Sequence, residues 1–194
     1  MDNLVEIIIK VRDEFSSAIN EVKGSLKGIG VVAGVAFAGL SMFMKSAIDE
    51  ATEYEAAVNR LTRILTTSRH ATEEQIQVLL DQANALDKVG VASEKNILIV
   101  QSQLATFDLS TEAIERMTPA ILDYVVAEKG ASATTEDYKQ LTNGLALALN
   151  GQFSSLTRTG FVLDDATKEM IKSGTETERT TAIVKVLNST YKDF

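Results

Sequence analysis

Residues 28–44 read GIGVVAGVAFAGLSMFM, a stretch without a charged residue that lies between Lys27 and Lys45. The stretch opens a longer pattern in which small or apolar residues recur at alternating steps of three and four. Such steps place all of these residues on one side of an α-helix, as in a heptad repeat. We call this row of residues the seam; its positions are Gly30, Ala33, Phe37, Leu40, Met44, Ala47, Ala51, Tyr54, Val58, Leu61 and Leu65.

The seam needs a neighbouring surface, because so apolar a row is not stable against water. Gly30, Gly34 and Ala38 add a small-x-x-x-small spacing, which lets helix backbones approach closely, so Gly34 is counted with the seam. The uncharged stretch is shorter than the roughly 20 residues that span a bilayer, and the pattern continues into a charged amphipathic helix. These features favour a coiled coil between copies of the chain. Contact with another protein, with a membrane, or with the chain's own domain stays open.

Composition narrows the classes of function. The chain of 194 residues is 45% apolar and 24% charged, as in ordinary globular proteins. Its 27 acidic and 19 basic residues give a net charge of −8, which argues against specific binding of nucleic acid. There is no cysteine, and His70 is the sole histidine. The sequence therefore predicts no catalytic site, no metal site and no cofactor.

After the seam, the sequence is typical of short amphipathic helices with their own start and stop signals. Serine, threonine or aspartate at a helix start accepts a hydrogen bond from the first turn, and glycine often ends a helix. The expected N-caps are Thr72 (a capping box with Gln75), Ser93, Ser110, Asp164 and Thr175 (a capping box with Glu178), and the expected stops are Gly90 and Gly130. One helix is expected over about 135–149. Pro119 is expected at the first residue of a helix, because proline in a helix interior is costly.

The sequence thus predicts a mainly all-α protein in two parts. Val5, Ile7, Ile9 and Val11 alternate with other residues, which favours a short N-terminal strand. Residues 1–66 are expected to form this strand and an elongated apolar helical arm that ends near residues 66–71. Residues 72–194 are expected to form a compact multi-helix domain.

Three segments in the last third resemble a known family. They are LALALNG at 145–151, LTRTGF at 156–161, and MIKSGTETER at 170–179 followed by VKVL at 184–187. Together with a short strand, a glycine-rich apolar helix and the TPAI segment at 118–121, in that order, they resemble the N-terminal part of tail tape measure proteins of bacteriophages and prophages. The resemblance covers nearly the whole chain, and 145–187 is its specific part.

The resemblance implies a non-enzymatic structural protein of the virion, located in the tail lumen and made in the bacterial host cytoplasm. The family sets tail length and templates the assembly of the tail tube. Its implied partners are other copies of itself and tail tube, tail tip or assembly chaperone proteins. The family also implies a role in DNA passage at infection, with transient contact of the inner membrane. We expect this chain to be the folded head of a longer protein, with the measuring segment beyond Phe194. The alternative is a membrane-active helical protein, such as a pore-former or effector.

Overall fold

The computed structural model describes residues 34–157 and 161–191, and within them every regular element is a helix. The prediction of an all-α protein is therefore confirmed for this part of the chain. The predicted N-terminal strand and the seam residues Gly30 and Ala33 lie outside the described residues. The helices are α2 (Gly34–Arg69), α3 (Glu73–Val89), α4 (Glu94–Ala105), α5 (Thr111–Lys129), the 3-10 turn η1 (Gly130–Ser132), α6 (Thr135–Leu149), α7 (Ser154–Thr157), α8 (Asp165–Ser173) and α9 (Glu176–Tyr191).

Most helix ends follow from local sequence signals. Thr72 and Gln75 form the expected capping box of α3, and Gly90 ends that helix in the left-handed conformation, at φ +84°. Ser93, Ser110 and Asp164 cap α4, α5 and α8 through their side-chain oxygens. The second predicted capping box is also present, because the side chains of Thr175 and Glu178 each accept from the other residue's backbone N–H. The side chains in these first turns therefore satisfy backbone donors that a helix leaves unpaired.

The chain divides into two units between Asp49 and Glu50, inside α2. The predicted boundary between residues 66 and 72 falls within the second unit, because the last turns of α2 contribute Ala57, Leu61 and Leu65 to its hydrophobic core. The physical reason is that these side chains are at most 7% exposed and belong to the same cluster as residues of the later helices.

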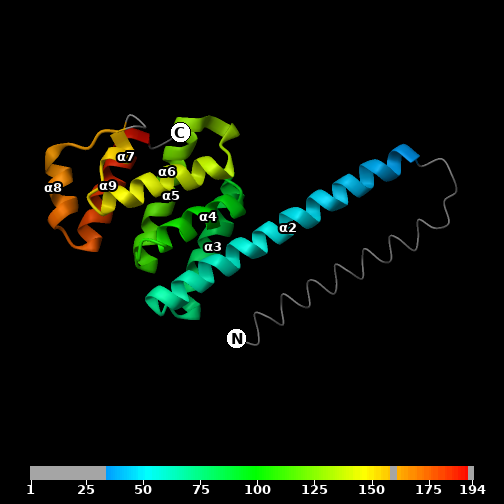
Figure 1. Cartoon of the computed structure of the whole chain (residues 1–194), viewed down its shortest axis with the longest axis horizontal. Coiled ribbons are helices and arrows are strands. Elements are labelled where there is room, and N and C mark those ends of the chain that lie inside the picture. Colours follow the sequence, from blue (N-terminus) through cyan, green and yellow to red (C-terminus); the bar gives the residue numbers. More distant parts are fainter. Residues whose placement is uncertain (1–33, 158–160, 192–194) are drawn as a thin grey trace. The chain divides into compact units, whose positions relative to one another are not determined.

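The helices α3 to α9 of the second unit pack together (Figure 1), and most of their buried apolar side chains belong to one hydrophobic cluster. The most extensive contacts join α5 with α9 and α4 with α6, and α3 and α5 also pack on α4. At one point of this core three aromatic rings meet, since Tyr124 lies 5.6 Å from Phe161 and 5.0 Å from Tyr191 between ring centroids. Helices distant in sequence are thereby held around one core.

Pro119 lies inside α5, and not at a helix start as the sequence suggested. A proline has no N–H, so it leaves the carbonyl of Glu115, four residues earlier, without its helical donor. The side-chain Nε2 of Gln82 on α3 donates to this carbonyl at 2.7 Å, and Gln82 Oε1 in turn accepts from Gln101 Nε2 at 3.1 Å. A donor from another helix thus replaces the missing backbone hydrogen bond, which sequence spacing does not reveal.

This replacement makes the effects of Gln82 and Pro119 interdependent. Gln82→Met is expected to lower the free energy of unfolding by about 1 kcal/mol, because the Glu115 carbonyl loses its donor. In a Pro119→Ala background the restored N–H serves that carbonyl, so the cost of Gln82→Met is expected to shrink. Urea denaturation of the four proteins of this double-mutant cycle measures the coupling.

Gln77→Met is the matched control, because Gln77 is exposed on α3 and, among the described residues, its side chain bonds to Asp81 of the same helix alone. Its expected effect is below about 0.5 kcal/mol. Strictly additive effects of the Gln82 and Pro119 changes would contradict the proposed replacement of the donor.

Candidate functional site

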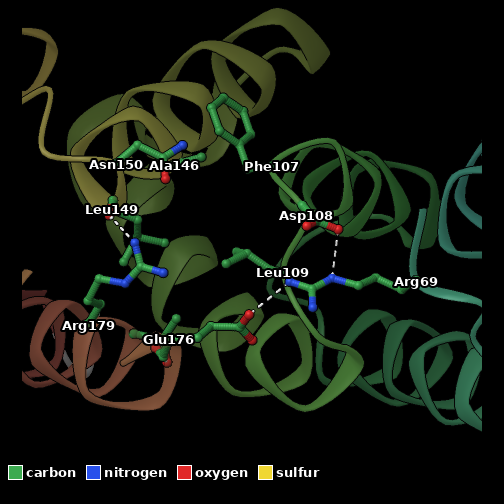
Figure 2. Close-up of a pocket in the computed structure, with 10 residues that line it drawn as sticks. Arg69, Phe107, Asp108, Leu109, Ala146, Leu149, Asn150, Glu176 and Arg179 are labelled. Carbon is green, nitrogen blue, oxygen red and sulfur yellow. Dashed lines mark hydrogen bonds and ion pairs between the residues drawn. The ribbon is translucent and has the colours of Figure 1, made fainter. Parts of the chain in front are cut away.

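The strongest candidate site is a cavity in the second unit where the ends of four elements meet. Its volume is about 320 Å³. The end of α2, the turn between α4 and α5, the end of α6 and the start of α9 surround it, and Figure 2 shows the side chains around the opening. The residues that line it are Arg69, Phe107, Asp108, Leu109, Ala146, Leu149, Asn150, Glu176, Arg179 and Thr180.

Two residues with positive φ angles, His70 and Asp108, position the side of the cavity that is on the right in Figure 2. His70 has φ +51° directly after Arg69, and the N–H of Ala71 donates to the carbonyl of Leu65, so α2 ends sharply there. Asp108 has φ +58° in the turn after α4. Aspartate and histidine adopt this conformation more readily than most residues other than glycine. The two turns bring Arg69 and Asp108 together, with 2.8 Å between Arg69 Nε and Asp108 Oδ1.

Glu176, the first residue of α9, joins three elements. Its Oε2 accepts from Arg69 Nη2 at 2.9 Å, and its Oε1 accepts from the backbone N–H and the hydroxyl of Ser110, the N-cap of α5. Partial burial raises the pKa of this carboxyl, but the hydrogen bonds from Ser110 and the nearby Arg69 outweigh it and lower the pKa below its ordinary value of 4.5. The ionised form of Glu176 is therefore the one that the folded chain favours.

This lowered pKa predicts a pH dependence of stability with a definite sign. The carboxyl titrates at a lower pH in the folded chain than in the unfolded one, so its contribution is present above pH 4.5 and is lost as the pH falls through the folded pKa. Glu176→Gln is expected to lower the free energy of unfolding by about 1 kcal/mol at pH 7, with the difference from wild type vanishing in acid. Denaturant melts between pH 2 and pH 7 measure it, with the pH values chosen as about 2, 4, 5 and 7 to bracket the titration of a carboxyl.

Glu136→Gln is the control for this experiment, because the Glu136 side chain is 80% exposed and its ion pair with Lys139 is within one helix. Its expected effect is below about 0.5 kcal/mol at every pH. If the Glu176 and Glu136 variants lost the same small amount of stability at pH 7, the hydrogen bonds of Glu176 to Arg69 and Ser110 would contribute nothing specific to stability.

The left-hand wall of Figure 2 is formed by Arg179 on α9 and the end of α6. Arg179 Nη1 donates to the backbone carbonyl of Leu149 at 3.0 Å, one of the last carbonyls of α6. Arg179 Nε is buried and has no hydrogen-bond partner among the described residues. A positive charge near the C-terminus of a helix is stabilising. Arg179 contacts the end of α6 through Nη1, while its Nε donor has no acceptor among the described residues.

The rest of the lining is mixed, because Asn150 and Thr180 are polar and the other side chains are apolar. Phe107, Leu109 and Leu149 contribute to the wall between the two arginines, and Leu109 and Leu149 are at least 95% buried. Arg69 is bound to two carboxylates, whereas no ion pair of Arg179 is present among the described residues. The cavity thus combines two arginines and two carboxylates with polar and apolar side chains.

The structure places the seam residues in two groups. Gly34, Phe37, Leu40, Met44 and Ala47 lie on α2 in the first unit, and Ala51 lies on α2 in the second. Tyr54 and Val58 are partly buried against the core of the second unit, and Leu61 and Leu65 are fully buried in it. For these last four positions the neighbouring surface is the chain's own domain, one of the alternatives that the sequence left open.

The sequence did not single out the cavity residues. Arg69 and Glu176 are separated by 107 positions, and no local spacing links a residue at one helix end to a residue at another helix start. The capping box of Thr175 and Glu178 predicts a helix start next to Glu176, but it does not identify the residues that Glu176 contacts.

Metal-binding clusters and membrane-spanning helices are absent from residues 34–157 and 161–191. No group of three or more histidine, cysteine, aspartate or glutamate side chains is arranged to hold a metal ion there. No helix within this part of the chain has the length and apolar character needed to cross a bilayer. Comparison with models of protein families, with curated proteins and with solved structures finds no match for the chain.

Proposed function

We propose that this chain is the head portion of a bacteriophage or prophage tail tape measure protein, a structural component of the virion without enzymatic activity. The observation that carries the proposal is the resemblance of residues 145–187 to that family. In this proposal the measuring segment follows the head in the parent protein, and the head is held within the tail assembly.

The positions of the resembling residues support a shared structure. Residues 145–151 form the end of α6 and the turn after it. Gly151 in this turn has φ +80°, a backbone conformation that is unfavourable for residues other than glycine. At Gly174, after α8, an added Cβ would lie 2.5 Å from the carbonyl oxygen of Met170. The backbone favours glycine at both positions, so these two residues of the resembling segments have structural roles.

The same segments are joined to one another in space. Arg179, in the third segment, donates to the carbonyl of Leu149, in the first. The helix α7, which contains Leu156 of the second segment, packs on α6, and α8 and α9 of the third segment also contact α6. Residues that resemble one family therefore meet in one part of the core, as expected if they are inherited together as a structural unit.

The partners follow from the family and from the seam. We propose that the seam residues before Ala51 associate with other copies or with tail tube, tail tip or chaperone proteins. The residues from Tyr54 to Leu65 are not included, because the core of the second unit occupies them. The proposed location is the tail lumen of the virion, after synthesis in the host cytoplasm.

Mass spectrometry of purified virions or tails tests the function. The particles are made by inducing the host of this gene, and peptides from residues 72–157 are quantified against the major tail tube protein. The proposal expects these peptides in a fixed ratio in intact tails and none in particles from a strain that lacks the gene, which should form no normal tails. Normal tails without the peptides would contradict it.

The proposed part in DNA passage depends on membrane contact by residues 28–44. Val35→Asp is expected to reduce binding to liposomes of bacterial inner-membrane lipids several-fold, because a charge in the bilayer core costs about 2.5–3.5 kcal/mol on insertion scales. Flotation of the full chain with liposomes measures this. Val89→Asp, at a side chain 76% exposed in the second unit, is the matched control and should bind as wild type does. Equal binding by all three proteins would remove the membrane role.

A further inference from the structure

We propose that two polar contacts between α2 and the start of α4 form a latch, and that opening of this latch releases the turn of α2 that carries the seam residues Tyr54 and Val58 from the core. The latch consists of Glu53 and Tyr54 on α2 and of Glu94 and Lys95 on α4. All of these contacts lie inside the second unit, so the inference does not depend on the tape measure proposal.

The latch joins two successive residues of one helix to two successive residues of another. Tyr54 Oη donates to Glu94 Oε1 at 3.1 Å, and Lys95 Nζ donates to Glu53 Oε2 at 2.6 Å. Burial, together with the nearby Glu94 carboxylate, raises the pKa of Tyr54 to about 12, so the phenol is protonated and can donate at neutral pH. Both contacts therefore hold the same turn of α2 against the first turn of α4.

Burial increases along α2 from the latch toward the end of the helix. The Glu53 side chain is 62% exposed, and Tyr54 is partly buried. Ala57 is 7% exposed, and Leu61 and Leu65 are fully buried. Loss of an exposed ion pair changes an equilibrium by up to about 5-fold, whereas truncation of a buried leucine changes it by about 30-fold or more. The turn with the latch is therefore held more weakly than the turns with the leucines, and it opens first.

An open latch changes how much of the seam the domain covers. Tyr54 and Val58 are seam positions that pack on the core of the second unit while the latch is closed. When they leave the core, Leu61 and Leu65 keep α2 attached to it. The boundary between the two units lies about one turn before the latch, so the released positions continue the earlier part of the seam. The latch thus sets the number of seam positions that are available outside the domain.

Thiol labelling tests the latch, because the chain contains no cysteine and a single introduced cysteine is its only thiol. Ala57→Cys, about one turn after the latch at a position 7% exposed, is the α2 reporter, and Val58→Cys on the same turn is a second one. Ala83→Cys, at a position 0% exposed on α3, is the core reporter. With a thiol reagent under native conditions, we expect the α2 reporter to react at least about 10-fold faster than the core reporter, because the latch opens without unfolding of the core.

Two substitutions weaken the latch without removing apolar groups from the core. Tyr54→Phe removes the hydroxyl, and Lys95→Gln removes the positive charge that binds Glu53. Together they are expected to speed labelling of the α2 reporter by about 5- to 30-fold. Lys139→Gln is the matched control, because it removes an exposed ion pair within α6, and it should leave labelling of the α2 reporter unchanged.

A substitution on another helix separates local opening from global unfolding. Ile183→Val, at a fully buried position of α9, is expected to speed labelling of the core reporter by about 2- to 10-fold and to leave the α2 reporter unchanged. Thermal melts establish that every variant is folded. Equal acceleration of both reporters by Ile183→Val, unchanged labelling of the α2 reporter in the latch variant, or equal rates for the two reporters in the otherwise unchanged chain would overturn the proposal.

Discussion

Leu61→Ala is expected to lower the free energy of unfolding of the second unit by about 2–5 kcal/mol, the range for truncating a buried leucine. Leu61 is 0% exposed and belongs to the hydrophobic core, although it lies on the long helix that begins at Gly34. The loss combines the removal of apolar area from the core with the cavity that remains. Guanidinium denaturation followed by circular dichroism measures it.

Val89→Ala is the control for this truncation, because the Val89 side chain is 76% exposed. Its expected effect is below about 0.5 kcal/mol. Light scattering of the same samples adds a second readout, since Leu61 faces the chain's own core and its truncation should leave the stoichiometry of any soluble oligomer unchanged. A Leu61 variant as stable as the Val89 variant would show that the end of α2 does not belong to the domain.

Gly174→Ala is the second large effect expected, a loss of about 1–3 kcal/mol or more. The added Cβ would lie 2.5 Å from the backbone oxygen of Met170 and 3.2 Å from Glu178 Cβ. A backbone oxygen cannot turn aside as a flexible side chain does, so the turn between α8 and α9 must shift. The N–H of Gly174 also donates to Met170 at 2.8 Å, and the shift would weaken that hydrogen bond.

Gly144→Ala is the matched control for Gly174→Ala. Gly144 lies inside α6, and the nearest atoms to an added Cβ are 3.9 Å away, at ordinary contact distance. Alanine is the better helix former, so this change is expected to raise the free energy of unfolding by about 0.5–1 kcal/mol. Thermal melts of both variants give the comparison. A Gly174 variant as stable as the Gly144 variant would mean that the α8–α9 turn accommodates a side chain.

The helix boundaries were the most predictable part of the fold. Caps act through atoms within three or four residues of each other, so the spacing of Thr72 and Gln75, or of Thr175 and Glu178, contains the whole interaction. The same holds for Gly90 and Gly130, whose positive φ angles end α3 and α5. A local interaction can be predicted from local sequence.

Pro119 marks the limit of this reasoning. The expectation for Pro119 considered only the hydrogen bonds within its own helix. The donor that replaces the missing bond is Gln82, on another helix and 33 positions from Glu115 in the chain. Thr118 also bonds back to the Ile114 carbonyl at 2.7 Å within the same turn. Such compensation depends on packing that the sequence pattern does not specify.

For the same reason, the sequence did not predict which surface covers the seam or which residues form the cavity. The spacing of Tyr54, Val58, Leu61 and Leu65 predicted an apolar helix face correctly, but periodicity does not identify the surface that covers it. The ion pairs of Arg69 with Asp108 and Glu176 connect the end of α2, the turn after α4 and the start of α9. No local sequence pattern links three residues so far apart in the chain.

Tail length in assembled particles is the most direct test of the proposal that this chain is the head of a molecular ruler. An in-frame duplication of about 60 residues, placed in the reading frame beyond the codon for Phe194, should lengthen tails by about 90 Å, at roughly 1.5 Å per residue of helix. Electron microscopy of negatively stained particles measures the change. Tails of unaltered length, or a stop codon directly after Phe194 in the gene, would contradict the claim.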